Sequence, residues 1–197
     1  MNTVWLNEIT LSGNIVTLIP LTRAHTDALL EASSDGELWN LWYTSAPSSK
    51  TIGAYLDNAF SEQDAGRALL FAVVDNTTQK IIGTTRYCNA DSQNQRVEIG
   101  YTWYAKSFQR TGVNTECKYL LLTHAFEMLN AIAVEFRTHW HNQASRAAIA
   151  RLGAKQDGVL RNHQRNAEGI YRDTVVFSII DQEWPTVKKS LEYKMRR

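Results

Sequence analysis

The spacing of hydrophobic and polar residues divides the chain into strands and helices. Strands are expected where β-branched and aromatic residues alternate or form short apolar runs, and helices where apolar residues recur every three or four positions. These patterns predict strands at 15–21, 67–75, 80–89, 95–105, 133–140, 155–165 and 170–180, and helices at 22–35, 49–63, 113–129, 142–154 and 181–197. The order of elements predicts a mixed α/β sheet.

The strand at 95–105 leads through a single glycine, Gly112, into an apolar helix. Strict alternation would place Val97, Ile99, Tyr101 and Trp103 on one face of this strand, and Glu98, Gly100, Thr102 and Tyr104 on the other. The first N–H groups of a helix lack partners and attract anions, so this strand–turn–helix segment is a candidate anion site. The chain has neither GxxxxGK[ST] nor GxGxxG, which disfavours a nucleotide-binding switch.

The helix after Gly112 has an unusually narrow polar side. Its polar residues Glu116, Thr123, Glu127 and Asn130 fall on one stripe, and nearly all the others are apolar. A helix with so wide an apolar surface is expected to be buried against a sheet over more than half of its circumference.

Composition and charge exclude several classes of protein. The 197 residues carry 21 basic and 20 acidic side chains, so the net charge does not indicate a nucleic-acid-binding protein. A local basic patch is compatible with this balance. Cys88 and Cys117 are isolated in the sequence, and the longest apolar runs, such as 68–74, are too short for a membrane span. We therefore expect a cytoplasmic protein that binds neither nucleic acid nor membranes.

Four stretches in their order along the chain resemble the GNAT acyltransferases, nearest to the RimJ/RimL-like branch. They are "VEIGYTWY", "QRTGVN", "AFEML" and "NQASRAAIARLGAKQDGVLR", and the resemblance covers roughly residues 15–193. It implies an α/β (α+β) GNAT fold, in which helices flank a mixed, mostly antiparallel central sheet with splayed central strands. It also implies a single domain over 1–197, with a core at 14–181 and a C-terminal helix at 182–197.

The resemblance further implies that the anion is the pyrophosphate of acetyl-CoA, held by backbone amides of residues 110–115 without a lysine or a metal. Asn114 stands where the family motif has glycine or alanine, so an altered loop shape is expected, with binding retained. Asn142 matches the family asparagine that contacts the pantetheine arm, and it equally suits a helix N-cap. The implied coenzyme contacts are Trp103, Tyr104, Ala105, Gln109, Arg110, Thr111, Gly112, Val113, Asn114, Thr115 and Asn142.

Two residues are candidates for the proton transfers of the implied reaction. Glu98 shares a strand face with Gly100, where a partly buried carboxylate would act as the base; the alternative is a structural ion pair with Arg86 or Arg96. Many relatives have a tyrosine at the position of Ile149 as the acid for the leaving thiolate. Ser145 occupies the place of the serine used in the RimL-like branch, and the alternative is a first-turn serine without a chemical task. Tyr101 and Tyr104 are reserve acids.

The acceptor amine is expected beside a group of aromatic residues. In a GNAT fold, Trp39, Trp42 and Tyr43 would border the acceptor groove, where they could seat an amine by cation–π contact or else pack in the core. Tyr87 is a further candidate for the acceptor wall. His139 and His141 share a strand face, but two ligands are too few for zinc, and no metal is expected.

The sequence thus predicts an N-acetyltransferase that transfers the acetyl group of acetyl-CoA to a primary amine by direct attack in a ternary complex. The acceptor would be a protein N-terminus or a small-molecule amine, and the enzyme a monomer or homodimer. The alternative is a non-catalytic CoA-binding sensor or scaffold of the same fold.

Overall fold

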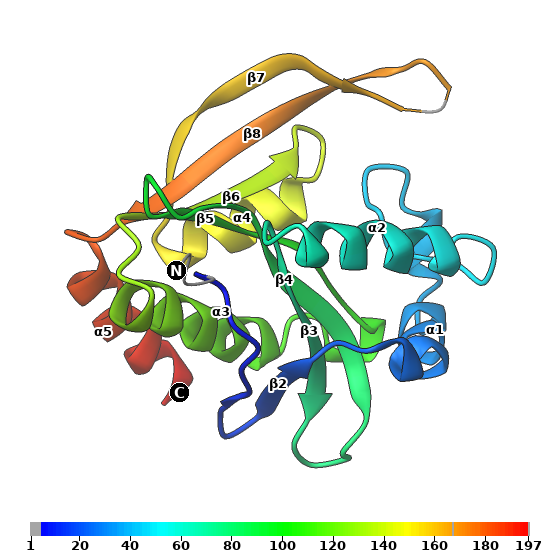
Figure 1. The fold of residues 1–197 in the computed structure, drawn as a ribbon, viewed down its shortest axis with the longest axis horizontal. Coiled ribbons are helices and arrows are strands. Elements are labelled where there is room, and N and C mark those ends of the chain that lie inside the picture. Colours follow the sequence, from blue (N-terminus) through cyan, green and yellow to red (C-terminus); the bar gives the residue numbers. More distant parts are fainter. Residues whose placement is uncertain (1–4, 167, 197) are drawn as a thin grey trace.

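A computed structural model describes residues 5–166 and 168–196 and contains one eight-stranded sheet with helices on both faces (Figure 1). The strands are β1 (Leu11–Ser12), β2 (Val16–Pro20), β3 (Leu69–Asp75), β4 (Ile81–Asp91), β5 (Arg96–Tyr104), β6 (Ala133–His139), β7 (Lys155–Arg165) and β8 (Tyr171–Ile180). The α-helices are α1 (Thr26–Ser34), α2 (Ile52–Asp64), α3 (Val113–Thr123), α4 (Gln143–Leu152) and α5 (Trp184–Met195). Within these residues, no helix is both long and apolar enough to cross a bilayer.

The sheet has the order β1-β2-β3-β4-β5-β6-β8-β7, and only the β5–β6 pair is parallel. β5 and β6 are paired only at Arg96–Glu98 against Ala133–Glu135, so the rest of β5 has no partner on that side. The expected mixed, mostly antiparallel sheet with parted central strands is confirmed.

The strict alternation predicted for β5 is wrong, because the strand contains a bulge. Thr84 lies opposite Trp103 and Arg86 lies opposite Gly100, so β5 has one extra residue in this interval. Tyr101 has a φ of 51°, the left-handed conformation that an extra residue can adopt. The bulge reverses the faces that follow it. Tyr104 therefore joins the main core with Val97 and Ile99, whereas Trp103 packs in a second core against α2.

The main core lies between the sheet and α3, α4 and α5, and α5 contributes Trp184, Val187 and Leu191 to it. A smaller core under α1 and α2 covers the other face. α3 ends at Thr123 and continues as a π-helical turn, His124–Met128, so the predicted long helix is divided in two.

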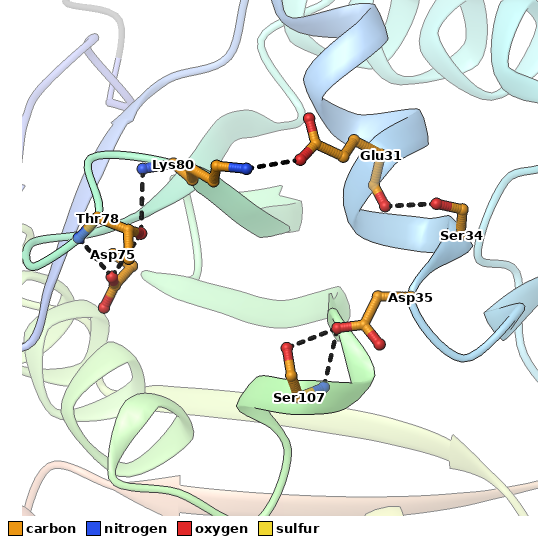
Figure 2. Close-up of polar contacts among 7 residues, drawn as sticks. All are labelled: Glu31, Ser34, Asp35, Asp75, Thr78, Lys80 and Ser107. Carbon is orange, nitrogen blue, oxygen red and sulfur yellow. Dashed lines mark hydrogen bonds and ion pairs between the residues drawn. The ribbon is translucent and has the colours of Figure 1, made fainter.

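Polar contacts fix the turn that follows β5 (Figure 2). The carboxylate of Asp35, at the end of α1, accepts hydrogen bonds from the N–H (3.0 Å) and the hydroxyl (2.5 Å) of Ser107, and its carbonyl accepts one from the N–H of Lys106. These contacts attach the 106–108 turn to α1, and residues 109–112 follow directly. One turn earlier on α1, Glu31 pairs with Lys80 at the end of the β3–β4 hairpin.

Glu116 belongs to the predicted polar stripe of this helix, but it is not exposed to solvent. It is buried, and its carboxylate accepts hydrogen bonds from the backbone N–H groups of Asn14 (2.9 Å), Ile15 (2.6 Å) and Val16 (2.8 Å). A single side chain of α3 therefore holds the start of β2.

We expect Glu116→Gln to destabilise the protein strongly. The amide would present one oxygen and an NH₂ group to three N–H donors, and lost hydrogen bonds to a buried charged group cost about 1.5–3 kcal/mol each. Urea denaturation should show a free energy of unfolding lower by about 3 kcal/mol or more. Glu192→Gln, at the Tyr119 contact on α5, is the control and should change it by less than about 1 kcal/mol. Equal effects in the two variants would contradict the role given to Glu116.

Candidate active site

The gap between β5 and β6 opens into a cavity of about 1090 Å³. Its walls come from the segment after α1, the unpaired part of β5, the 106–111 turn, α3, α4 and the β7–β8 hairpin. In the part of the chain that the structure describes, the wall contains seven basic side chains and one acidic side chain, Glu98; the basic residues are Lys106, Arg110, Lys118, Arg137, Arg151, Arg165 and Arg172. The balanced overall charge thus conceals a locally basic cavity suited to a polyanion.

The start of α3 has the free donors of an anion site. No side chain caps this helix, and in residues 5–166 and 168–196 the N–H groups of Gly112, Asn114 and Thr115 have no acceptor. The N–H of Val113 donates to the hydroxyl of Thr111. Arg110 has a φ of 62° and lines the cavity just before the helix. A basic loop and unpaired amides therefore meet at the positive end of the helix dipole.

The structure gives the backbone of this loop. Asn114 lies in the first turn of α3, and Arg110 is the residue in the left-handed conformation. The side-chain oxygen of Asn114 accepts a hydrogen bond from the hydroxyl of Tyr104 (3.3 Å). Gly112 has an ordinary φ of −66°, and what it provides is space, because a Cβ there would lie 2.8 Å from Ile15 Cδ1.

The other residues expected to contact the coenzyme have mixed placements. Trp103, Tyr104, Gln109, Thr111 and Asn142 line the cavity, whereas Ala105, Gly112, Val113 and Thr115 do not. The N–H of Ala105 donates to the carbonyl of Ile82 and is therefore not free to bind the coenzyme. Asn142 is the N-cap of α4 and accepts a hydrogen bond from the N–H of Ser145, which leaves its NH₂ group for a ligand.

Glu98 and Ser145 both line the cavity. Glu98 is only 7% exposed; it accepts a hydrogen bond from Asn89 (2.7 Å) and lies 3.5 Å from the guanidinium of Arg137. Its ionic partner is therefore Arg137, and neither Arg86 nor Arg96. Loss of solvation on burial raises the pKa of Glu98, and the contacts to Asn89 and Arg137 oppose this only in part. A raised pKa suits a carboxylate that accepts a proton near neutral pH.

Only two of the four aromatic residues predicted for the acceptor wall line the cavity. Trp42 and Tyr43 line the cavity, and Trp42 is 64% exposed and packs edge-on against His139 at 4.9 Å. Trp39 is half-buried outside the cavity wall. Tyr87 is fully buried in the main core, where its hydroxyl donates to the carbonyl of Leu121, so it cannot contact an acceptor. Over residues 5–166 and 168–196, no three metal-ligating side chains gather to form a metal site.

Lys118 is a buried residue of this cavity that the sequence pattern missed. It is 5% exposed and lies one turn after Asn114 on α3, and its side chain reaches the cavity wall. The available signal was a lysine outside the polar stripe of an otherwise buried helix.

Comparison with known proteins identifies the family of the chain. Residues 16–155 match the family described as "Acetyltransferase (GNAT) domain". The chain is 35% identical over 96 residues to "Putative ribosomal N-acetyltransferase YdaF" of Bacillus subtilis, a match that covers 49% of this chain and 51% of that protein. This curated relative is thus matched over about half of its length.

Solved structures extend the similarity to nearly the whole chain. A GCN5-related N-acetyltransferase from Brucella melitensis has a TM-score of 0.86 and 29% identity, with coverage of 96% of this chain and 86% of that one. RimJ of Mycobacterium smegmatis, solved with CoA-disulfide, has a TM-score of 0.78 over 100% of this chain and 98% of its own; at 20% identity it shows a shared fold only. The chain belongs to the GNAT acetyltransferase family.

Proposed function

We propose that the protein transfers the acetyl group of acetyl-CoA to a primary amine by direct attack in a ternary complex. The observation that carries the proposal is that the uncapped start of α3 and the gap between β5 and β6 open into one basic cavity. The RimJ structure that shares this fold was solved with a CoA derivative, which supports the choice of coenzyme.

The residues present fit this coenzyme. Arg110 and Asn114 line the cavity, and they would hold the diphosphate with the free N–H groups of the adjoining Gly112 and Thr115. The NH₂ group of Asn142 would contact the pantetheine arm. The backbone of Trp103 and Tyr104 borders the gap where the thioester would lie. When bound, acetyl-CoA supplies an activated acyl group. The diphosphate is a handle remote from the reaction, so a phosphate-polarising lysine or metal is not needed there.

The protein's own residues would carry the proton transfers. Glu98 would accept a proton from the acceptor ammonium, directly or through a water, since its carboxylate is buried in the cavity wall. Ser145, on the first turn of α4, would donate a hydrogen bond to the departing sulfur.

Trp42 and Tyr43 would form the wall that receives the amine. The relative named as a ribosomal N-acetyltransferase favours a protein N-terminus as the acceptor, and a small-molecule amine is the other possibility. The second candidate function is a CoA-binding sensor without turnover, which the absence of a tyrosine at Ile149 favours.

A thiol-release assay with acetyl-CoA distinguishes the two functions. A panel of amines and of peptides with free N-termini should contain an acceptor that stimulates CoA release. Tight CoA binding with no stimulation by any acceptor would support the sensor and contradict the transferase.

Ser145→Ala should lower the maximal rate of thiol release more than it lowers the affinity for CoA. One hydrogen bond to a developing anion contributes about 1.5–3 kcal/mol, so a loss of about tenfold or more in kcat is expected. The cap of α4 uses the backbone N–H of Ser145 and survives this substitution. Steady-state kinetics and CoA titration check the prediction, and an unchanged kcat would remove Ser145 from the mechanism.

A further inference from the structure

Lys118 is a buried cation without a counter-ion. Its ammonium donates to the hydroxyls of Thr102 (2.6 Å) and Thr85 (3.4 Å), which lie 2.7 Å from each other. Among the described residues, no carboxylate lies within ion-pair distance of Lys118. An ammonium group has three N–H donors, and these two hydroxyls receive only two of them.

Such an arrangement is unfavourable for stability alone. Burying a charged group without an ionic partner costs several kcal/mol, and an apolar side chain of similar volume avoids that cost. Burial also lowers the pKa of Lys118 to about 8, because loss of solvation disfavours the charged form. A lysine kept in this position is therefore better explained by a ligand or a reaction than by packing.

The location of Lys118 indicates whether it acts on the acceptor amine or on the leaving thiolate. Thr102 belongs to the unpaired part of β5, so the ammonium lies within one hydrogen bond of the strand that borders the gap. Lys118 approaches from the face that α3 covers, where the hydroxyl of Tyr104 also meets Asn114.

Glu98 lies on the opposite face of the sheet. A Cβ on Gly100 would lie 3.0 Å from the Glu98 carboxylate, and Gly100 pairs with Arg86, which packs over Tyr55 of α2. Both Glu98 and Lys118 line the same cavity, because the parted strands leave a passage between the two faces. A base and an acid that reach one cavity from different faces suit acyl transfer, in which the amine adds to the carbonyl carbon and the thiolate then leaves the tetrahedral adduct.

We propose that Lys118 donates the proton that converts the departing thiolate to the thiol, an inference that rests on the proposed acetyl transfer. The acceptor nitrogen forms a bond to the acetyl carbon, the carbon–sulfur bond breaks, and its electron pair stays on sulfur. A proton then moves from Lys118 Nζ to that sulfur, which leaves a neutral amine that regains a proton from solvent. Glu98 removes the proton from the acceptor nitrogen. Ser145 contributes a hydrogen bond, and Lys118 supplies the proton that a hydroxyl of high pKa gives up poorly.

The sign of the pH dependence follows from the acid form of Lys118. As pH rises through about 8, the protonated fraction of Lys118 falls, so kcat at a saturating acceptor concentration should decline above that pH. The titratable groups that interact with Lys118 are Cys88 on β4 and Cys117 on α3. Burial raises the pKa of both thiols, so they stay neutral in this range and do not account for the decline.

The test is the ionisation of the thiol of bound CoA, followed by the ultraviolet absorbance of its thiolate as pH is raised. An ammonium beside the sulfur lowers the pKa of that thiol relative to free CoA. The shift should be present in the wild type, in Lys118→Arg and in the control Lys189→Met, which alters an exposed lysine on α5, and lost in Lys118→Met. Lys118→Met should also lower kcat about 100-fold and remove the decline at high pH.

The outcomes separate this inference from the proposed function. If the wild type does not bind CoA, the proposed function fails. If it binds CoA but the bound thiol titrates like free CoA, or if Lys118→Met keeps the shift, the role of Lys118 is overturned. The wild-type titration decides even where Lys118→Met does not fold, although its urea midpoint should equal or exceed that of the wild type.

Discussion

Replacing Gly112 with glutamate is expected to weaken CoA binding by about 100-fold or more while the fold remains intact. The new carboxylate would lie at the start of α3, where it competes for the free N–H groups and repels a diphosphate. A loss of about 3 kcal/mol corresponds to a factor of about 100 in Kd. The backbone tolerates the change, because Gly112 has a φ of −66° and the near contact is the terminal carbon of the partly exposed Ile15 side chain.

Gly112→Ala is the matched control. It introduces the same contact with Ile15 but no charge, so its affinity for CoA should stay within about threefold of the wild type, a difference of less than 1 kcal/mol. Titration calorimetry measures both affinities, and urea denaturation verifies both folds. If Gly112→Glu binds CoA as tightly as Gly112→Ala, the diphosphate does not lie at the start of α3.

The second large effect is expected for Glu98→Gln, which should lower kcat by about 100-fold or more. Burial raises the pKa of Glu98, so the wild-type rate should fall as pH decreases through that raised value and the carboxylate becomes protonated. The amide cannot accept the proton, so the variant should lose this decline at low pH. A pH profile of kcat at saturating acceptor concentration measures both changes.

Glu135→Gln tests whether the effect is specific to Glu98. Glu135 also pairs with Arg137 and lies on the neighbouring strand, but it is not part of the cavity wall. This control should shift the decline at low pH without removing it and should keep most of the rate. Were Glu98→Gln to retain the wild-type profile, the base would be another group or a water held elsewhere.

The order of elements could be predicted from the sequence because it depends on local periodicity. The hairpin at 75–80, the strand leading to Gly112 and the cap at Asn142 are each specified within a few residues. The overall charge balance, by contrast, gave no sign of the seven basic residues that the fold gathers around one cavity.

What could not be predicted depends on contacts between distant segments. The bulge at Tyr101 arises from the register of β5 against β4, and it moves Trp103 and Tyr104 to the faces opposite to those expected. Glu116 resembles an ordinary surface residue of a helix until β2, about 100 positions earlier in the chain, places its N–H groups beside it.

Tyr87 was wrongly predicted to contact a ligand, and Lys118 was missed, for the same reason. Tyr87 resembled a ligand contact but is buried in the core, with its hydroxyl bonded to a carbonyl of α3. Lys118 resembled part of an apolar helix but reaches the cavity. Periodicity predicts the face of a helix or strand on which a residue lies. Only the tertiary structure shows which other segments that face contacts.

The most direct test of the account is a crystal structure of the protein with CoA bound. The diphosphate should lie on the amides of residues 110–115, and the pantetheine arm should run between β5 and β6 with its sulfur near Lys118 and Ser145. A diphosphate bound at any other place, or a closed gap between the two strands, would contradict the central claim.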